Sequence, residues 1–292
     1  MLVDAHCHPC NLAGLFPESE KERRRLGVVA AASACDIEEF THNEMLARNA
    51  VESGASALLP CFAVHPQQFA ANNEQFKMSG GKLTKGNERF PMDDERFAML
   101  DKLASEKRIA AVGECGFDLY NAVFRETEAL QDRSFTAHME TAIRCDLPVV
   151  LHVRRAMFKI FYNINKLTKC KAVIFHSWPG TAEEGRALLR RGVNAYFSFG
   201  NVIILNHKQA IRSFAMLPAE RLLTETDAPY QPPRGESYSQ WSNLPRILET
   251  AAVIRNEAGN NTDVKELETQ IENNFKAIFG SNLQDLRHKS LL

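Results

Sequence analysis

Short apolar runs alternate along the chain with longer amphipathic stretches. Most of the short runs stay apolar until their last residues, which is typical of parallel strands covered on both faces. Strands are predicted at residues 2–6, 27–33, 57–65, 109–114, 148–152, 172–176, 193–198 and 221–227. Helices are predicted between and after them, at residues 36–53, 92–107, 125–146, 155–169, 181–191, 206–216, 240–258 and 263–279. Strands and helices are therefore expected to alternate over most of the chain.

This order indicates an α/β fold, a (β/α)8 barrel of the TIM type. A doubly wound parallel sheet is the alternative, but no glycine-rich phosphate turn follows the first strand. The length of 292 residues suits one barrel, because barrels often run to about 250 residues. We expect a single domain over 1–292, with a polar, glycine-bearing excursion around 71–91. A tolerated surface insertion is the simpler interpretation of that excursion, and a substrate lid is the other.

The charged residues nearly balance, with 35 Lys and Arg against 36 Asp and Glu and a formal net charge of -1. This balance argues against a broad basic surface that holds nucleic acid by releasing counterions. It does not exclude a phosphate substrate, because bound metal ions supply local positive charge that the sequence sum omits.

Seven cysteines are spread irregularly along the chain and form one C-x-x-C unit, Cys7 to Cys10. No second unit completes a zinc ribbon. We interpret the thiols as reduced and mostly structural, which is typical of a reducing compartment. The chemistry-bearing run starts at residue 4, which leaves no room for a secretory leader. No apolar run approaches the roughly 18 residues of a membrane span. We expect a cytoplasmic protein with no membrane association.

Ionisable residues gather at the carboxyl ends of the predicted strands. They are His6 and His8 on the first strand, His65 on the third, Glu114 on the fourth, His152 on the fifth, His176 on the sixth and Asp227 on the eighth. In a barrel these ends converge on one mouth. Imidazoles and carboxylates bind first-row divalent metals, whereas core packing does not explain so many buried ionisable groups. The sequence therefore predicts a metal centre.

Strand parity refines the first run, because His6 and His8 project to one side and Cys7 to the other. Asp4 shares the parity of the two histidines. It could be a ligand, but we expect it to orient a ligand histidine instead. The remaining histidines are expected in surface or packing roles, since histidine is common at partly buried positions: His42, His138, His207 and His288.

Six motifs occur in order along the chain. They are D-A-H-C-H (4–8), H-P (65–66), V-G-E-C-G-F-D (112–118), H-V-R-R-A (152–156), H-S-W-P-G (176–180) and T-E-T-D-A-P-Y (224–230). Together they resemble the TatD-like metal-dependent deoxyribonuclease family, in the wider amidohydrolase-type barrel superfamily. The resemblance runs from residue 1 to about residue 280, where the barrel is expected to close.

The resemblance implies a hydrolase that cleaves phosphodiester bonds of DNA, including single strands, with metal-activated water. It implies two divalent ions per chain, for which zinc, manganese, nickel or magnesium are suitable. By position, His6, His8 and Asp227 bind one metal, Glu114 bridges to the second, His152 and His176 complete that second site, and His65 and Arg154 lie near the phosphate. Asp227 and Glu114 are the expected catalytic residues, with Asp227 as general base. Exonuclease action is expected, and endonuclease action stays open.

Two departures from the family pattern fall near the expected substrate cleft. Trp178 and Pro179 stand where a phenylalanine and a small hydroxyl residue usually precede the glycine, and the segment after Tyr230 is altered. Both bear on substrate preference more than on the chemistry. Three aromatic residues in or beside the motifs could stack on bases or pack the barrel rim: Phe117, Trp178 and Tyr230.

Two other functions remain open. The same scaffold could hydrolyse another ester or an amide, such as an aminoacyl ester, because fold does not fix the substrate. Arg154 and Arg155 favour phosphate, since a guanidinium matches phosphate oxygens, although either arginine could simply close a salt bridge. A binding protein that kept the barrel is the second alternative, but such a protein is expected to lose ligands, and this chain has all of them.

Overall fold

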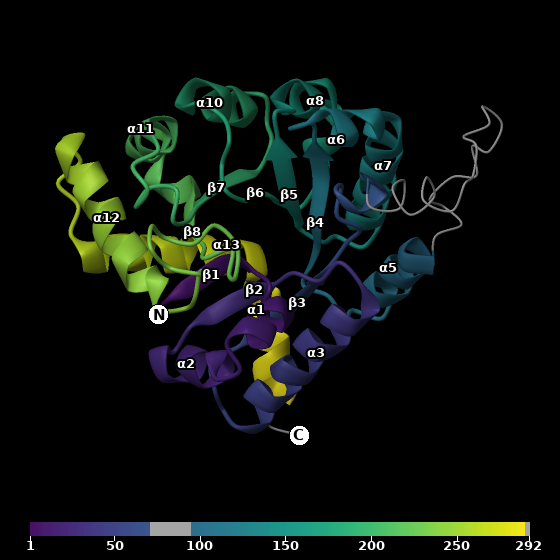
Figure 1. Ribbon diagram of the computed structural model, residues 1–292, viewed down its shortest axis with the longest axis horizontal. Helices are drawn as coiled ribbons and strands as arrows, with labels where there is room; N and C mark the ends of the chain where they lie inside the picture. The colour runs from purple at the N-terminus through teal and green to yellow at the C-terminus, as the bar shows by residue number, and fades with distance from the viewer. Residues whose placement is uncertain (71–94, 290–292) are drawn as a thin grey trace.

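The computed structural model describes residues 1–70 and 95–289, and these form an eight-stranded parallel barrel (Figure 1). The strands pair in chain order, each with the next. Their bounds are β1 Val3–Cys7, β2 Val29–Ala32, β3 Leu58–Phe62, β4 Ala111–Asp118, β5 Val149–Arg154, β6 Val173–Phe175, β7 Ala195–Phe199 and β8 Leu222–Thr224. The predicted (β/α)8 barrel is confirmed. A doubly wound sheet is excluded, because its strand order would reverse at a switch point.

The barrel closes between its last and first strands, just beyond β8. The amide of Asp227 donates to the carbonyl of His6 at 3.0 Å, and the amide of His8 donates to the carbonyl of Ala228 at 2.8 Å. Lower in the barrel, the Thr224 hydroxyl donates to the carbonyl of Val3 at 3.1 Å. The backbone that closes the barrel therefore belongs to two of the predicted ligands, His8 and Asp227, and to the carbonyl of a third.

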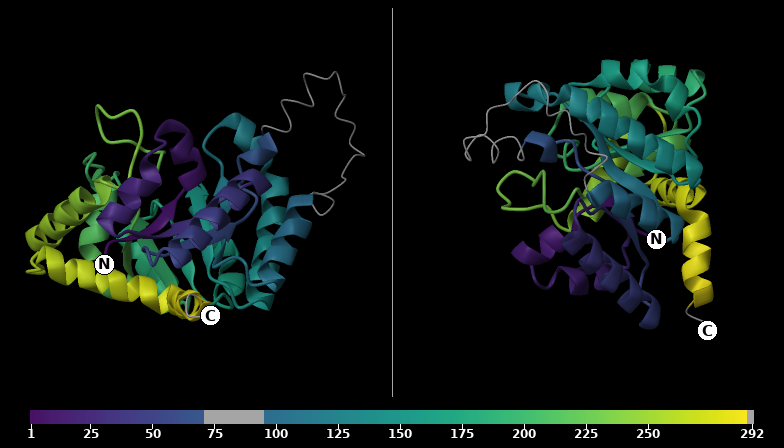
Figure 2. Two further views of the ribbon diagram at one scale, coloured as in Figure 1. Left: turned by 90° about the horizontal axis from the view of Figure 1, so that it is seen from below. Right: turned by 90° about the vertical axis from the view of Figure 1, so that its right-hand side faces the viewer.

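Helices surround the barrel (Figures 1 and 2). Their bounds are α1 Pro9–Leu15, α2 Ser19–Leu26, α3 Ile37–Glu52, α5 Glu95–Ser105, α6 Ala122–Glu126, α7 Glu128–Arg144, α8 Met157–Tyr162, α9 Ile164–Leu167, α10 Ala182–Arg190, α11 Lys208–Met216, α12 Asn243–Glu257 and α13 Val264–Lys289, with a short 3-10 helix at Ala219–Arg221. In residues 1–70 and 95–289, no helix is both long enough and apolar enough to span a bilayer.

The long helix α13 covers the end of the barrel where the strands begin. The Asn274 side-chain amide donates to the carbonyls of Ala219 and Leu222, both at 2.8 Å, which ties α13 to the start of β8. Phe275 and Phe279 on the same helix are fully buried. This end is therefore sealed, and the opposite end, where the strands finish, is left for the site.

Several elements differ from the predicted ones. Strand β4 continues four residues past Glu114, to Asp118. The predicted helix 155–169 divides into α8 and α9 around Asn163, and two helices fill 9–26, where none was predicted. The 71–91 excursion lies outside the described residues.

The cysteines agree with the expectation of reduced thiols. All seven lie in the described ranges and are free. Cys7 is fully buried in a small apolar cluster with Leu12 and Val28, and its thiol lies 3.4 Å from the carbonyl of Ala31. It therefore points away from the two histidines beside it, as strand parity predicts.

His138 on α7 has the predicted packing role, and it also supports the site. Its ring is fully buried. The Nδ1 atom donates to the carbonyl of Ser134 at 2.8 Å, and Nε2 accepts from the amide of Val64 at 3.0 Å. Val64 directly precedes His65, so the neutral imidazole fixes the backbone that presents a predicted site residue. Burial lowers the pKa of His138 from 6.5 to about 4.

This shift predicts a pH-dependent contribution to stability. The pKa of His138 is lower in the folded state than in the unfolded state. Between these two pKa values the unfolded chain therefore binds more protons than the folded chain. The contribution of His138 is complete above pH 6.5 and is lost as the pH falls towards 4. We expect the free energy of unfolding of the wild type, relative to His138→Gln, to fall by about 2 kcal/mol between pH 7 and pH 5. Urea titrations of both proteins measure it, and a pH-independent difference contradicts it.

Candidate metal centre

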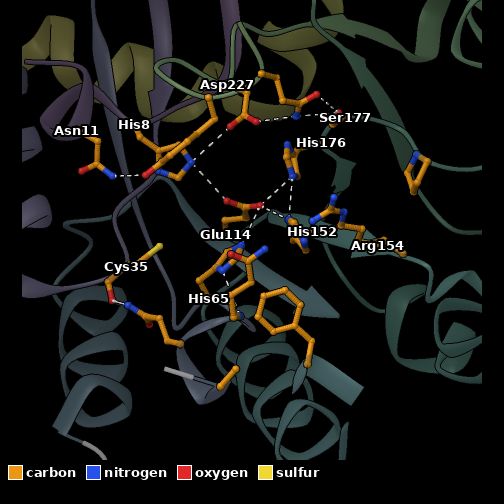
Figure 3. A pocket seen from close by; sticks show the side chains of 18 of the residues that line it. His8, Asn11, Cys35, His65, Glu114, His152, Arg154, His176, Ser177 and Asp227 are labelled. Carbon is orange, nitrogen blue, oxygen red and sulfur yellow. Dashed lines mark hydrogen bonds and ion pairs between the residues drawn. The ribbon is translucent and has the colours of Figure 1, made fainter. Parts of the chain in front are cut away.

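Five imidazoles and two carboxylates meet where the strands finish, and Glu114 lies at the centre of them. Figure 3 shows Glu114 with Asp227 and four of these imidazoles, those of His8, His65, His152 and His176. One of its oxygens, Oε1, faces three imidazoles. It lies 2.7 Å from Nδ1 of His152, 2.8 Å from Nε2 of His176 and 3.4 Å from Nε2 of His65. These residues come from β4, β5 and the segments that follow β6 and β3.

The other oxygen of Glu114, Oε2, faces the first-strand pair. It lies 3.2 Å from Nε2 of His6 and 3.4 Å from Nε2 of His8. The Oδ1 atom of Asp227 lies 3.4 Å and 3.6 Å from the same two nitrogens. The structure thus brings together all the residues that the sequence predicts as ligands, and it places His65 among them.

Glu114 does not end its strand, which corrects one detail of the sequence analysis. It lies in the middle of β4, where the pairing with β5 shifts register between Val112 and Cys115. Such an irregularity re-aims a side chain, and irregularities of this kind recur beside active sites. The apolar run alone does not reveal it.

Outer contacts fix the orientation of three imidazoles. Nδ1 of His6 lies 3.1 Å from the Ser33 hydroxyl. Nδ1 of His176 lies 3.5 Å from Oε1 of the buried Glu225. Nε2 of His152 lies 3.2 Å from Oδ2 of Asp118. A carboxylate or hydroxyl on the outer nitrogen sets the tautomer and leaves the inner nitrogen for a metal.

Asp118 is a site residue that the sequence analysis missed. It is fully buried, its Oδ2 also accepts from the Gln67 side chain at 2.7 Å, and its backbone is held by the Gln131 side chain on both sides. The available signal was parity, because Asp118 and Glu114 are four residues apart on one strand. Glu225 stands two residues before Asp227 and could have been recognised in the same way.

Asp4 makes different contacts from the predicted ones. Its Oδ1 accepts from the amides of His6 at 3.2 Å and Thr226 at 3.0 Å, and its Oδ2 accepts from the Thr226 hydroxyl at 2.6 Å. Burial raises the pKa of Asp4 to about 7. The carboxyl group therefore ties the first strand to the segment after β8 through backbone amides and a hydroxyl.

The ionisable groups of the cluster have shifted pKa values that favour ionised carboxylates and a bound positive charge. Burial raises the pKa of Glu114, but the facing imidazoles of His176, His65 and His6 outweigh it and hold that pKa well below its usual range. Burial and His176 lower the pKa of His6, but Glu114 and Asp227 outweigh them and raise it to about 9. The two ionised carboxylates therefore favour protonation of the imidazoles that face them. A bound cation would supply this positive charge in place of the protons.

The donor set fits divalent metal. Within the described residues, three groups of ligand atoms lie within 4.8 Å of one another: His6, His8 and Asp227; His6, Glu114 and His176; and His65, Glu114 and His152. Nitrogens face each other in two pairs, at 3.1 Å between His6 and His8 and at 3.2 Å between His152 and His176. A cation between such a pair satisfies both lone pairs at once, and imidazole with carboxylate suits first-row metals.

A cavity of about 950 Å³ opens above the cluster, which is near the upper size of small-molecule pockets. Tyr230 lines it, is 48% exposed and accepts a hydrogen bond from Asn11 at 2.8 Å. Trp178 is buried instead, against Phe175 and Phe197, and Phe117 is also buried. Of the three candidate stacking residues, only Tyr230 is therefore placed to meet a ligand.

Gly116 permits β4 and β5 to approach closely beside His152. A Cβ atom at this position would lie 2.2 Å from the carbonyl oxygen of His152, and φ of +136° is unfavourable for any other residue. We expect Gly116→Ala to displace His152, to weaken metal retention and to lower the free energy of unfolding by about 2 kcal/mol or more.

The matched control for this substitution is Gly14→Ala on α1, where an added Cβ meets no heavy atom within 4 Å. Urea unfolding and metal analysis of both variants test the expectation. Equal stability and equal metal content in the two variants contradict it.

Comparisons with known proteins agree with this geometry. The sequence profile of the family described as TatD related DNase matches residues 3–280. The chain is 30% identical to the uncharacterized metal-dependent hydrolase YcfH of Escherichia coli K12, over 98% of this chain and 99% of that protein. It is 34% identical to the 3'-5' ssDNA/RNA exonuclease TatD of Cronobacter sakazakii, over 65% of this chain and 72% of that protein.

Solved structures show the same fold. The TatD homologue YJJV of Escherichia coli K12 superposes with a TM-score of 0.75 at 22% identity, over 96% of this chain and 98% of that one. A TatD family hydrolase of Entamoeba histolytica gives a TM-score of 0.71 at 17% identity, over 95% and 97% of the two chains. On its sequence and fold together, this chain belongs to the TatD related DNase family and is a metal-dependent hydrolase.

Proposed function

We propose that this protein is a deoxyribonuclease that hydrolyses phosphodiester bonds of single-stranded DNA from one end. The observation that carries the proposal is the position of Glu114, with one oxygen toward His152 and His176 and the other toward His6 and His8. A carboxylate shared in this way suits a pair of cations, and paired cations are a common solution to phosphodiester hydrolysis. The nuclease name carried by TatD relatives supports the same substrate class.

Two divalent ions are proposed per chain, with zinc, manganese, nickel and magnesium as candidates. His6, His8 and Asp227 would hold one, His152 and His176 the other, and Glu114 both. When bound, such a pair lowers the pKa of the attacking water and offsets charge on the phosphoryl oxygens. This chain's own residues supply the proton transfers and the positioning.

Asp227 is the proposed general base. Its Oδ2 accepts from the Gln231 side chain at 2.7 Å, while Oδ1 faces the first-strand imidazoles. Burial raises the pKa of Asp227, but the hydrogen bond to His6 and the nearby imidazoles outweigh it and lower that pKa. The carboxylate is therefore ionised at neutral pH, held in one orientation, and able to accept a proton from the attacking water.

His65 is the proposed donor to the substrate phosphate. Burial lowers its pKa, which keeps the imidazole neutral near pH 7. Its Nδ1 accepts from the amide of Gln67 at 3.3 Å, so the proton resides on Nε2, the atom that faces Glu114. A neutral N–H at this position can donate a hydrogen bond to a phosphoryl oxygen, and it adds no positive charge that would repel a nearby metal ion.

A time course on end-labelled single-stranded and double-stranded DNA tests the proposal, with each candidate metal and with a chelator. A ladder that shortens from one end of the single strand is expected, together with loss of activity in chelator and recovery on adding metal. Internal cuts would overturn the exonuclease assignment. Hydrolysis of simple esters or amides, with the oligonucleotide left intact, would overturn the substrate class.

A further inference from the structure

Arg154 lines the cavity and carries a partly exposed guanidinium. Its guanidinium carbon lies 3.7 Å from the centroid of the Tyr120 ring, and its side chain is 46% exposed. Within the described part of the chain, it donates no hydrogen bond at normal distance, and its nearest acid, Oδ2 of Asp118, is 4.0 Å away. The Tyr120 ring therefore orients the guanidinium, and the N–H groups of the guanidinium remain available to bind a ligand.

Tyr120 is itself held firmly. Its amide donates to Oδ1 of Asp118 at 2.9 Å, and its carbonyl accepts from Arg155 at 3.3 Å. The guanidinium of Arg155 also lies over the ring, 4.6 Å from its centroid. Tyr120 is 42% exposed, and Asn121, the next residue, lines the cavity. The tyrosine thus forms a fixed support at the rim.

Tyr120 and Arg154 lie on the outer side of His152. Glu114 faces Nδ1 of that imidazole, whereas Asp118 faces Nε2, and Arg154 lies beyond Asp118. An imidazole and a carboxylate therefore separate the guanidinium from the centre of the cluster, and Figure 3 shows Arg154 beside His152 and away from Glu114. Arg154 therefore lies on the side of His152 that is turned away from Glu114.

We propose that Tyr120 is a positioning residue that holds Arg154 to bind the phosphate next to the scissile one. The inference rests on the proposed function and deepens it: the site recognises a strand with at least two phosphates, rather than an isolated phosphodiester. A partly exposed guanidinium held over an aromatic ring can bind a phosphate through two parallel hydrogen bonds. Because the Arg154 side chain is already ordered by stacking on Tyr120, it loses less conformational entropy when it binds the phosphate.

Two substrates separate this role from a role at the scissile phosphate. A short single-stranded oligonucleotide offers the neighbouring phosphate, and bis(nitrophenyl) phosphate has only the reacting one. Arg154→Gln is expected to raise KM for the oligonucleotide about tenfold or more, with kcat/KM for the small diester unchanged within about twofold. Tyr120→Leu should raise the oligonucleotide KM about threefold, and Tyr120→Phe should restore it, because the stack needs the ring.

Salt dependence provides a readout independent of turnover. Anisotropy of the labelled oligonucleotide, titrated with EDTA-treated protein, should lose about 0.7 from its log–log salt slope in Arg154→Gln, as for one phosphate contact on a single strand. The matched control is Tyr162→Leu on α8, a tyrosine that is 87% exposed, and it should change neither KM nor the slope.

The outcomes distinguish the inference from the function on which it rests. Wild type that cleaves neither substrate means that the proposed function fails. Wild type that cleaves both, with Arg154→Gln equally impaired on both, places Arg154 at the scissile phosphate and overturns the inference alone. An unchanged oligonucleotide KM and salt slope in Arg154→Gln also overturn it. A loss confined to the oligonucleotide, reproduced by Tyr120→Leu and absent in Tyr120→Phe, supports it.

Discussion

Asp227→Asn is expected to lower kcat for DNA hydrolysis by about 10³-fold or more, with the fold intact. A positioned general base is worth about 10²–10⁴-fold, and this substitution also removes a negative charge that faces His6 and His8. The amide keeps the size of the carboxylate, and its oxygen can still accept from Gln231. Loss of turnover would therefore reflect lost chemistry and charge, with little change in packing.

Single-turnover kinetics at saturating metal measure this loss, and the unfolding midpoint in urea shows that the variant is folded. Asp146→Asn is the matched control, because the Asp146 side chain is 79% exposed and lies outside the cluster. It should retain wild-type kcat. Near-normal hydrolysis by Asp227→Asn at saturating metal would refute the assignment of Asp227 as general base.

Glu114→Gln is expected to abolish both activity and stable metal retention. The amide is neutral and keeps only one oxygen. Both groups of imidazoles therefore lose the negative charge of Glu114, and one of them faces an NH2 donor in place of an acceptor. Changing an outer-shell partner of a metal ligand already costs about 10–100-fold in affinity or activity, and Glu114 touches both groups directly. We expect metal affinity to fall by more than about 100-fold and at least one ion per chain to be lost on dialysis.

Elemental analysis after dialysis, with calorimetric titration of the metal-free protein, gives the stoichiometry and affinity. Glu183→Gln on α10 is the control, since that side chain is 60% exposed and lies outside the cluster, 3.6 Å from Arg212. Full metal content and activity in Glu114→Gln would show that Glu114 does not bridge. The two variants are also expected to differ in metal content. Asp227→Asn leaves the group of His152 and His176 unchanged, whereas Glu114→Gln changes both groups.

The parts of the fold that the sequence predicted correctly are those with strong periodicity and a defined end. Buried strands read as apolar runs, and their helices begin at recognisable caps, such as the reciprocal capping box of Thr181 and Glu184 on α10. The site followed because strand ends converge in a barrel whatever the loops do. His6, His8, His152 and His176 could therefore be grouped before any distance was known.

Other features depend on tertiary contacts that no local pattern encodes. The two helices in 9–26 are short, and the second has a mostly polar sequence. Leu12 on the first packs in an apolar cluster with Cys7 of β1 and Ala30 of β2. The register shift that aims Glu114 is a property of β4 and β5 together. Trp178 is buried because Phe175 and Phe197 surround it, so an aromatic residue within a motif did not by itself indicate a ligand contact.

The closure of the barrel links metal occupancy to folding. Two of the backbone bonds that join the last strand segment to the first are donated by the amides of Asp227 and His8, and one of them is accepted by the carbonyl of His6. Any local opening of this seam therefore dismantles the ligand group that the same three residues provide. A cation bound there favours the closed form by mass action, by about 2.7 kcal/mol at a hundredfold excess over its dissociation constant. Metal bound by His6, His8 and Asp227 would therefore make the closed seam more stable.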